Sequence, residues 1–323
     1  MKYYFFIFIL IAFASFKAQG QPVPSPEENI PFLITFGNRA CPSWGDPDFS
    51  SIWFFIVPET YRGLVHIRVF DPDVGGMHDE LNGAWDTRVT YSIFGGREAY
   101  THPGAQQVNP KGNFRTGTLL ATRTFGVDPR WDNQWFTFGP FDPTQGEHVP
   151  RYGGYIFKVV CEGIEGDDGN LYQYFLSSSA TENIPIEGAN AFAFEYKFRL
   201  HSTPNQISHI YPFVDPESTR IRVENFDWDN DGQIRVTSEV RREQLISVSG
   251  DNVWANTEFV VMEGERGRSL NIQFIPRGIR NNNVVINVRN QRGEFLRFYS
   301  SPIGGIPRYR HGIQATRRSQ NNP

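Results

Sequence analysis

The chain has 323 residues, of which 35 are acidic and 31 basic, and its formal net charge is −4. This balance excludes the broad basic field with which proteins bind nucleic acid. Aromatic residues make up 15% of the chain, and glycine and proline contribute 30 and 22 residues. Short aromatic segments separated by dense turn residues predict an all-β protein.

The N-terminus predicts export. Met1-Lys2 is followed by an apolar run from Tyr3 to Phe16, and Ala18-Gln19-Gly20 then offers small residues at the positions that a signal peptidase inspects. The run is shorter than the ~20 apolar residues that span a bilayer, so a signal peptide over residues 1–20 is favoured over a membrane anchor. We therefore expect a secreted, extracellular or periplasmic protein, and the Phe/Ile-rich signal favours a bacterial source.

The two cysteines, Cys41 and Cys161, fit this destination. In an oxidising compartment they are expected to form a disulfide. The bond would close a loop of ~120 residues and, in the loop-entropy model, stabilise the fold by roughly 4–5 kcal/mol. The alternative is a pair of free thiols that are buried as small apolar residues.

Alternating residues predict a first β domain over residues 31–200, after an exposed Pro- and Glu-rich lead-in over residues 21–30. The clearest alternation covers residues 191–200, where large apolar residues occupy every second position and Glu195, Lys197 and Arg199 lie between them. A period of two predicts one face on a core and one face in water. Further strands are expected at 64–70, 87–94, 135–138 and 155–161.

The polar stretch 201–206 ends this pattern and predicts a linker. Seven short strands in the next ~100 residues are typical of an immunoglobulin-like sandwich, which we assign to residues 207–307. Residues 308–323 are Arg-rich and without pattern, which predicts a disordered basic tail. The sequence thus predicts two tandem antiparallel β-sandwich domains of jelly-roll or immunoglobulin-like type. Strands of the second domain are expected at 207–214, 220–226, 233–240, 258–262, 270–275, 284–288 and 294–299.

Residues 227–232 read Asp-Trp-Asp-Asn-Asp-Gly and carry the sharpest chemical pattern in the chain. Ca²⁺ takes six to eight oxygen ligands, and acidic residues at alternate positions before a glycine direct carboxylates at one centre. These six residues resemble the calcium loops of EF-hands and dockerins. At the twelfth position, where those loops carry a bidentate glutamate, this chain has Ser238.

The pattern therefore predicts a structural Ca²⁺ site at Asp227, Asp229 and Asp231. Gln233 and Glu239, on the strand that follows, are expected to supply further oxygen ligands. The alternative is an ordinary hairpin turn without a metal, because Asn-Asp-Gly suits positive φ.

A second acidic loop lies between the expected strands 64–70 and 87–94 and predicts another Ca²⁺ site. Its spacing matches no motif, and a solvated loop is the alternative. A third acidic stretch, residues 162–169, follows Cys161, and an ordinary hairpin turn is its default interpretation. If the disulfide forms, this stretch is expected at the same end of a sandwich as the second loop. The candidate ligands in the second loop are Asp71, Asp73, Asp79, Glu80 and Asp86.

Trp131 and Trp135 stand among polar residues in the aromatic segment 131–141. Exposed tryptophans beside Asp and Asn stack on sugar rings and bind their hydroxyl groups, which predicts a carbohydrate platform. The alternative is a core strand whose aromatic residues face the interior.

These features predict a secreted or cell-surface binding or adhesion module that calcium stabilises, with carbohydrate as the first candidate ligand and a cell-surface protein as another. A secreted hydrolase of polysaccharide or peptide is the alternative enzyme, with Glu147, Glu162 and Glu195 as candidate carboxylates. A subunit of an extracellular assembly, in which partners cover exposed strand edges, is a third possibility.

Overall fold

The computed structural model describes residues 22–41, 49–108, 111–279 and 282–309. The expected signal peptide and residues 310–323 of the expected tail lie outside these ranges. The all-β prediction is confirmed, because the described residues form antiparallel sheets joined by loops and 3₁₀ turns. In this part of the chain no helix has the length and apolar character needed to cross a membrane. The 3₁₀ turns are η1 (Pro26–Glu28), η3 (Pro103–Gln106), η4 (Pro143–Gln145), η5 (Pro150–Tyr152) and η6 (Glu263–Glu265).

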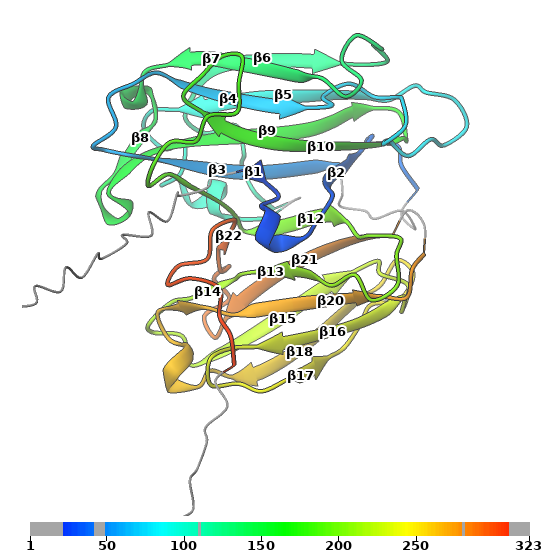
Figure 1. The fold of residues 1–323 in the computed structure, drawn as a ribbon, viewed down its shortest axis with the longest axis vertical. Coiled ribbons are helices and arrows are strands. Elements are labelled where there is room, and N and C mark those ends of the chain that lie inside the picture. Colours follow the sequence, from blue (N-terminus) through cyan, green and yellow to red (C-terminus); the bar gives the residue numbers. More distant parts are fainter. Residues whose placement is uncertain (1–21, 42–48, 109–110, 280–281, 310–323) are drawn as a thin grey trace, which may run out of the picture.

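The first sandwich, in the upper half of Figure 1, packs two sheets around an aromatic core. Phe55 contacts Tyr174 and Tyr91 contacts Tyr172 between the sheets, with ring centroids 5.9 and 5.5 Å apart. One sheet contains β2 (Phe32–Phe36), β10 (Gly169–Ser177), β4 (Val65–Phe70) and β7 (Trp135–Phe141), with β1 (Pro22–Val23) paired to β10. The other runs β22 (Phe298–Tyr299), β11 (Asn190–Ala193), β3 (Ser50–Pro58), β9 (Gly154–Glu165), β5 (Arg88–Gly95), β6 (Thr118–Phe125), with β8 (Glu147–Val149) paired to β9.

The second sandwich, in the lower half of Figure 1, uses most strands of the predicted second domain. Alternation is the reason that these strands have one core face: Ile234 and Val236 on β16 are fully buried, while Arg235 between them reaches the outer face. One layer contains β18 (Trp254–Val260), β15 (Arg220–Phe226) and β21 (Asn283–Asn290). The other is a four-stranded sheet of β13 (Ser208–Ile210), β20 (Asn271–Pro276), β16 (Gly232–Thr237) and β17 (Gln244–Ile246), and β14 (Phe213–Val214) pairs separately with β19 (Arg268–Ser269).

Strand β12 (Glu195–Arg199) lies at the junction and pairs with β2 on one side and β21 on the other. The largest sheet therefore runs through both sandwiches, in the order β18-β15-β21-β12-β2-β10-β4-β7. Strand β22, near the C-terminus, crosses back to pair with β11 of the first sandwich. The two predicted domains thus share a sheet, and one strand of the second, β22, pairs within the first.

The prediction of one wet face for residues 191–200 is wrong. The segment is two strands, β11 and β12, which belong to different sheets. Both faces of β12 are covered, so Glu195, Lys197 and Arg199 are buried with exposed fractions of 9%, 1% and 9%. The residues alternate as expected, but segments of the first sandwich cover the face that was expected to meet water: Lys197 donates to the Ser50 carbonyl, and Arg199 pairs with Glu80.

The predicted exposed lead-in over residues 21–30 is also corrected. Val23 and Glu28 are fully buried, and Ile30 is nearly so. Strand β1 pairs with β10 of the first sandwich, while the Asn29 side chain donates to the Ile207 carbonyl at 2.8 Å in the second. The segment is buried because it joins the two sandwiches.

The predicted disulfide is wrong. Cys41 is exposed and Cys161 is completely buried, and no bond joins them. The Cys161 thiol points into the core of the first sandwich, where burial raises its pKa to about 12 and neighbouring hydroxyls of Tyr172 and Thr35 act against that rise. The spacing of two cysteines in a sequence does not reveal whether the fold brings their side chains together.

Candidate functional site

Residues 227–231 connect strands of different sheets, so the loop is not the hairpin turn that was the alternative to a calcium loop. Strand β15 pairs with β18 and β21, whereas β16 pairs with β17 and β20. Trp228 fills the end of the second sandwich at 1% exposure, with its ring centroid 5.3 Å from that of Phe274. The buried indole anchors the loop and leaves the neighbouring carboxylates at the surface.

The carboxylates of Asp227 and Asp229 meet that of Asp251, with oxygens of all three within 4.8 Å of one another. The backbone of Asn252 donates to Asp227 Oδ1 at 2.7 Å and so ties the two loops together. Partial burial, together with the charges of Asp229 and Asp251, raises the pKa of Asp227 to about 6. Burial and the charge of Asp251 also raise the pKa of Asp229. A bound cation would relieve the repulsion between these carboxylates, and carboxylate oxygens are the ligands that a hard cation prefers.

Three of the predicted ligands of this loop lie outside the group. Asp231 accepts a hydrogen bond from Asn282 Nδ2 at 3.2 Å, and Glu239 forms an ion pair with Arg268. Gln233 lies exposed on β16. Asp251 was missed because it is 19 residues beyond the end of the motif and has no acidic neighbour in the sequence.

The carboxylates of the second acidic loop have different partners and do not form one site. Asp79 accepts from the backbone of Leu171 at 2.7 Å and of Gly75 at 2.8 Å, and burial raises its pKa well above the ordinary value. Glu80 forms a buried ion pair with Arg199. Asp71 and Asp73 instead converge with Asp132, which lies in the aromatic segment.

Asp86 joins the third acidic stretch. Its carboxylate lies within 4.8 Å of those of Asp167 and Asp168, so the second and third acidic loops are neighbours. Asp168 is fully buried and accepts backbone hydrogen bonds from Asn82, Asp86 and Thr87 at 2.9, 3.0 and 3.1 Å. These bonds give Asp168 a structural role in holding the two loops together.

The two tryptophans of the predicted platform are half-buried. The Arg68 guanidinium lies 5.2 Å from the ring centroid of Trp135. Trp131 packs edge-on against Phe136, with centroids 5.1 Å apart, and against the core of the first sandwich. These contacts favour the core alternative for Trp131, whereas Trp135 contacts Arg68, Phe70 and Phe175 outside the core cluster.

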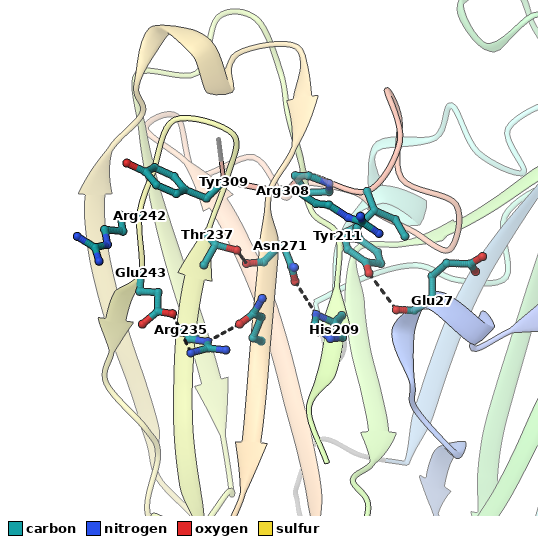
Figure 2. A pocket seen from close by; sticks show the side chains of 13 residues that line it. Glu27, His209, Tyr211, Arg235, Thr237, Arg242, Glu243, Asn271, Arg308 and Tyr309 are labelled. Carbon is teal, nitrogen blue, oxygen red and sulfur yellow. Dashed lines mark hydrogen bonds and ion pairs between the residues drawn. The ribbon is translucent and has the colours of Figure 1, made fainter. Parts of the chain in front are cut away.

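A groove of about 570 Å³ lies on the outer face of the four-stranded sheet (Figure 2). Its floor consists of side chains that alternate with core residues on β13, β16 and β20, and residues 306–309 and Glu27 form its walls. His209 Nδ1 and Asn271 Oδ1 are 3.0 Å apart, and Arg235 forms an ion pair with Glu243 at 3.1 Å. Burial lowers the pKa of His209, which therefore stays neutral near pH 7.

Aromatic rings complete the groove. The Tyr211 ring lies parallel to that of His209, at 6.4 Å, and its hydroxyl donates to the Glu27 carbonyl at 2.9 Å. Tyr309, at 37% exposure, projects at the rim near Arg242 (Figure 2). The groove was not predicted from the sequence. Alternating polar residues, as on β16 and β20, predict a face in contact with water, and residues 308 and 309 were assigned to the disordered tail.

The three candidate hydrolase carboxylates have separate partners. Glu147 is buried, which favours its protonated form, but hydrogen bonds from Thr101, Tyr100 and Glu98 outweigh this effect and lower its pKa. Glu162 pairs with Arg115 at 3.3 Å, and Glu195 pairs with Lys197 at the same distance.

Comparisons with known proteins add little. No family model and no curated protein match the chain. One similar solved structure is the N-terminal CBM22-1-CBM22-2 tandem domain from Paenibacillus barcinonensis Xyn10C, at 8% identity and a TM-score of 0.16, with 73% of this chain and 78% of that chain covered. A score this low carries no argument about fold or ligand.

Proposed function

We propose that this chain is a secreted binding protein that holds a glycan in the groove of its second sandwich. The observation that carries the proposal is the groove itself, which combines hydrogen-bonding side chains on its floor with an exposed ring at its rim. Ligand sites generally unite a few convergent polar groups with aromatic surface in one concavity.

The chemistry of the lining favours a hydroxyl-rich and acidic ligand. Arg235, Asn271 and Gln273 offer donors on the floor, where sugar hydroxyl groups need them. Tyr309 offers a planar face of the kind on which a sugar ring stacks. Three guanidinium groups line the groove against two carboxylates, so a uronic or otherwise acidic glycan is favoured over a neutral one. The charged residues are Arg235, Arg242, Arg308, Glu27 and Glu243.

Export and a structural calcium ion belong to the same proposal. The N-terminal apolar run supports export. The convergence of Asp227, Asp229 and Asp251, none of which forms an ion pair within the described part of the chain, supports calcium. Calcium would neutralise the three charges and fasten two loops of the second sandwich, so that its binding energy adds to the stability of the fold.

The experiment is a glycan array with the chain from residue 21 to residue 323, followed by calorimetry with the best acidic glycan. We expect Tyr309→Ala to weaken binding about tenfold, which corresponds to about 1.4 kcal/mol. Trp254→Ala is the matched control, because Trp254 is similarly exposed, at 43%, on the opposite sheet. Equal loss in both variants, or no glycan bound by the unmodified chain, would refute the proposal.

A subunit of an extracellular assembly is a second candidate, which edge strand β18 favours. This strand ends the largest sheet and carries Trp254 and Val260, which are 43% and 59% exposed. An edge of this kind is a template for pairing with another chain. Light scattering would test it: a monomer at every concentration up to about 100 µM excludes self-assembly through this edge.

A further inference from the structure

Three carboxylates meet at one end of the first sandwich. Strands β4 and β7 are neighbours, and Phe70 is paired with Trp135. Asp71 and Asp73 directly follow β4 and Asp132 shortly precedes β7, so the pairing brings residues about 60 positions apart to the same sheet end. Their carboxylate oxygens lie within 4.8 Å of one another.

This group is more deeply buried than the two other groups of three carboxylates. Asp71 and Asp73 are each only 2% exposed, and Asp132 is half-buried. No ion pair between described residues includes any of the three. Burying a carboxylate without a cation is costly, because the charge loses its hydration and gains nothing in return.

Asp73 supplies the second observation. Its Oδ1 is buried and has no hydrogen-bond partner, and its Oδ2 accepts only a long bond of 3.3 Å, from the backbone of Asp128. Buried polar atoms in native proteins nearly always have partners, so an orphaned carboxylate oxygen among other carboxylates indicates a missing positive ligand.

The two other acidic groups lack this feature. Asp168, the buried member of the group with Asp86 and Asp167, already accepts three backbone hydrogen bonds. In the group of Asp227, Asp229 and Asp251, the side chains of Asp229 and Asp251 are exposed, and no carboxylate oxygen is buried without a partner. Only at Asp73, among these groups in the described residues, does a buried carboxylate oxygen have no partner.

We propose that Asp71, Asp73 and Asp132 bind a calcium ion that joins the loop after β4 to the loop before β7. Three carboxylates supply hard oxygen ligands, and water or backbone carbonyls complete the six to eight that Ca²⁺ takes. This inference goes beyond the proposed glycan site, which lies in the other sandwich.

The loop after β4 and the loop before β7 lie close together at this site. The backbone of Asn133 donates to Asp71 Oδ1 at 2.8 Å, which holds the segment of Asp132 over that of Asp71. Gly76 has φ of 75°, and a Cβ at this position would lie 2.4 Å from Asp132 Oδ1. A glycine is therefore required here on two grounds, the backbone conformation and the space that the carboxylate occupies.

Terbium luminescence provides a direct test, since Tb³⁺ replaces Ca²⁺ and is excited through a nearby indole. Trp131 precedes Asp132 in the chain and supplies that indole. The experiment uses the chain from residue 21 to residue 323 carrying Asp227→Asn and Asp229→Asn, which removes the exposed group. We expect saturable luminescence that calcium displaces, and at least a tenfold loss of affinity on adding Asp73→Asn.

Asp86→Asn in the same background is the matched control and should leave the luminescence unchanged. Asp73→Asn removes a buried charge, so its melting temperature in EDTA should equal or exceed that of its parent. If that variant does not fold, Asp132→Asn replaces it, because Asp132 is less buried. Absence of luminescence in the background chain, unchanged affinity in Asp73→Asn, or loss in Asp86→Asn would overturn the proposal.

Discussion

Glu195 Oε1 and Lys197 Nζ lie 3.3 Å apart on strand β12, with side chains 7% and 1% exposed. The two residues share one face of the strand that joins the sandwiches, and residues of the first sandwich, among them Ser50, lie against that face. Burial raises the pKa of Glu195, and the ammonium group of Lys197 counteracts this effect. The pair therefore places two charges in the interior at the junction, where each depends on the other.

We expect Lys197→Met to lower the free energy of unfolding by about 3–5 kcal/mol, because it leaves the Glu195 carboxylate buried without its partner. The double change Glu195→Leu with Lys197→Met should recover most of that loss. Urea unfolding followed by tryptophan fluorescence measures both. A single variant within about 1 kcal/mol of the unmodified chain would contradict the importance of the pair.

Glu28 predicts a dependence of stability on pH. Burial raises its pKa to about 8, and the backbone of Ser25 donates to its Oε2 at 2.6 Å. The groups that face it are Glu27, Tyr196 and Tyr211. The folded chain binds a proton here that the unfolded chain releases near pH 4.5, so this contribution to stability is complete at low pH and is lost as the pH rises toward 8.

Glu28→Gln keeps the hydrogen-bond acceptor and removes the titration. The variant should melt higher than the unmodified chain at pH 8, by at least about 2–4 °C, which corresponds to about 1 kcal/mol. The difference should vanish near pH 4.5. Scanning calorimetry of both chains across this range measures it, and parallel curves would show that Glu28 is not the responsible group.

The arrangement of the loop at 227–231 predicts which aspartates matter for calcium. Saturating calcium at about 100 times its Kd should stabilise the fold by about 2.7 kcal/mol. The double change Asp227→Asn with Asp229→Asn should abolish the part of this effect that belongs to the loop. Asp231→Asn should retain it, since Asp231 faces Asn282 instead. Melting curves with calcium and with EDTA compare the variants, and loss in Asp231→Asn would favour the sequence motif over the observed geometry.

The cysteines predict insensitivity to reducing agents. Without a bond between Cys41 and Cys161, dithiothreitol should shift the melting temperature by less than about 1 °C, whereas a disulfide closing this loop would be worth several kcal/mol. In the folded chain we expect iodoacetamide to modify Cys41 and spare Cys161, whose burial raises its pKa to about 12. Mass spectrometry after unfolding without reductant should find two modified cysteines. Finding none would restore the disulfide.

Part of the candidate metal sites could be predicted from the sequence. The alternation of apolar residues sets strand positions, so the segment expected at 220–226 is strand β15, Arg220–Phe226. Acidic residues that follow such strands lie at sheet ends, and for this reason Asp71, Asp73, Asp227 and Asp229 fall in carboxylate groups. The third members, Asp132 and Asp251, could not be predicted, because strand pairing and loop packing bring them in from other segments.

The sequence by itself determined the fold class and the approximate positions of strands such as β4, β5 and β15, because backbone preference and side-chain alternation act over a few neighbouring residues. Strands β2, β3, β6 and β10 were not predicted, and the segment expected as one strand at 191–200 is two. Only the tertiary structure decided which sheet each strand joins, and with it the burial of Lys197, the separation of Cys41 from Cys161, and the groove beneath Tyr309. These features depend on contacts between distant segments. A strand's outer face carries the same polar residues whether water, another segment of the chain or a ligand covers it, so the local pattern does not distinguish the three.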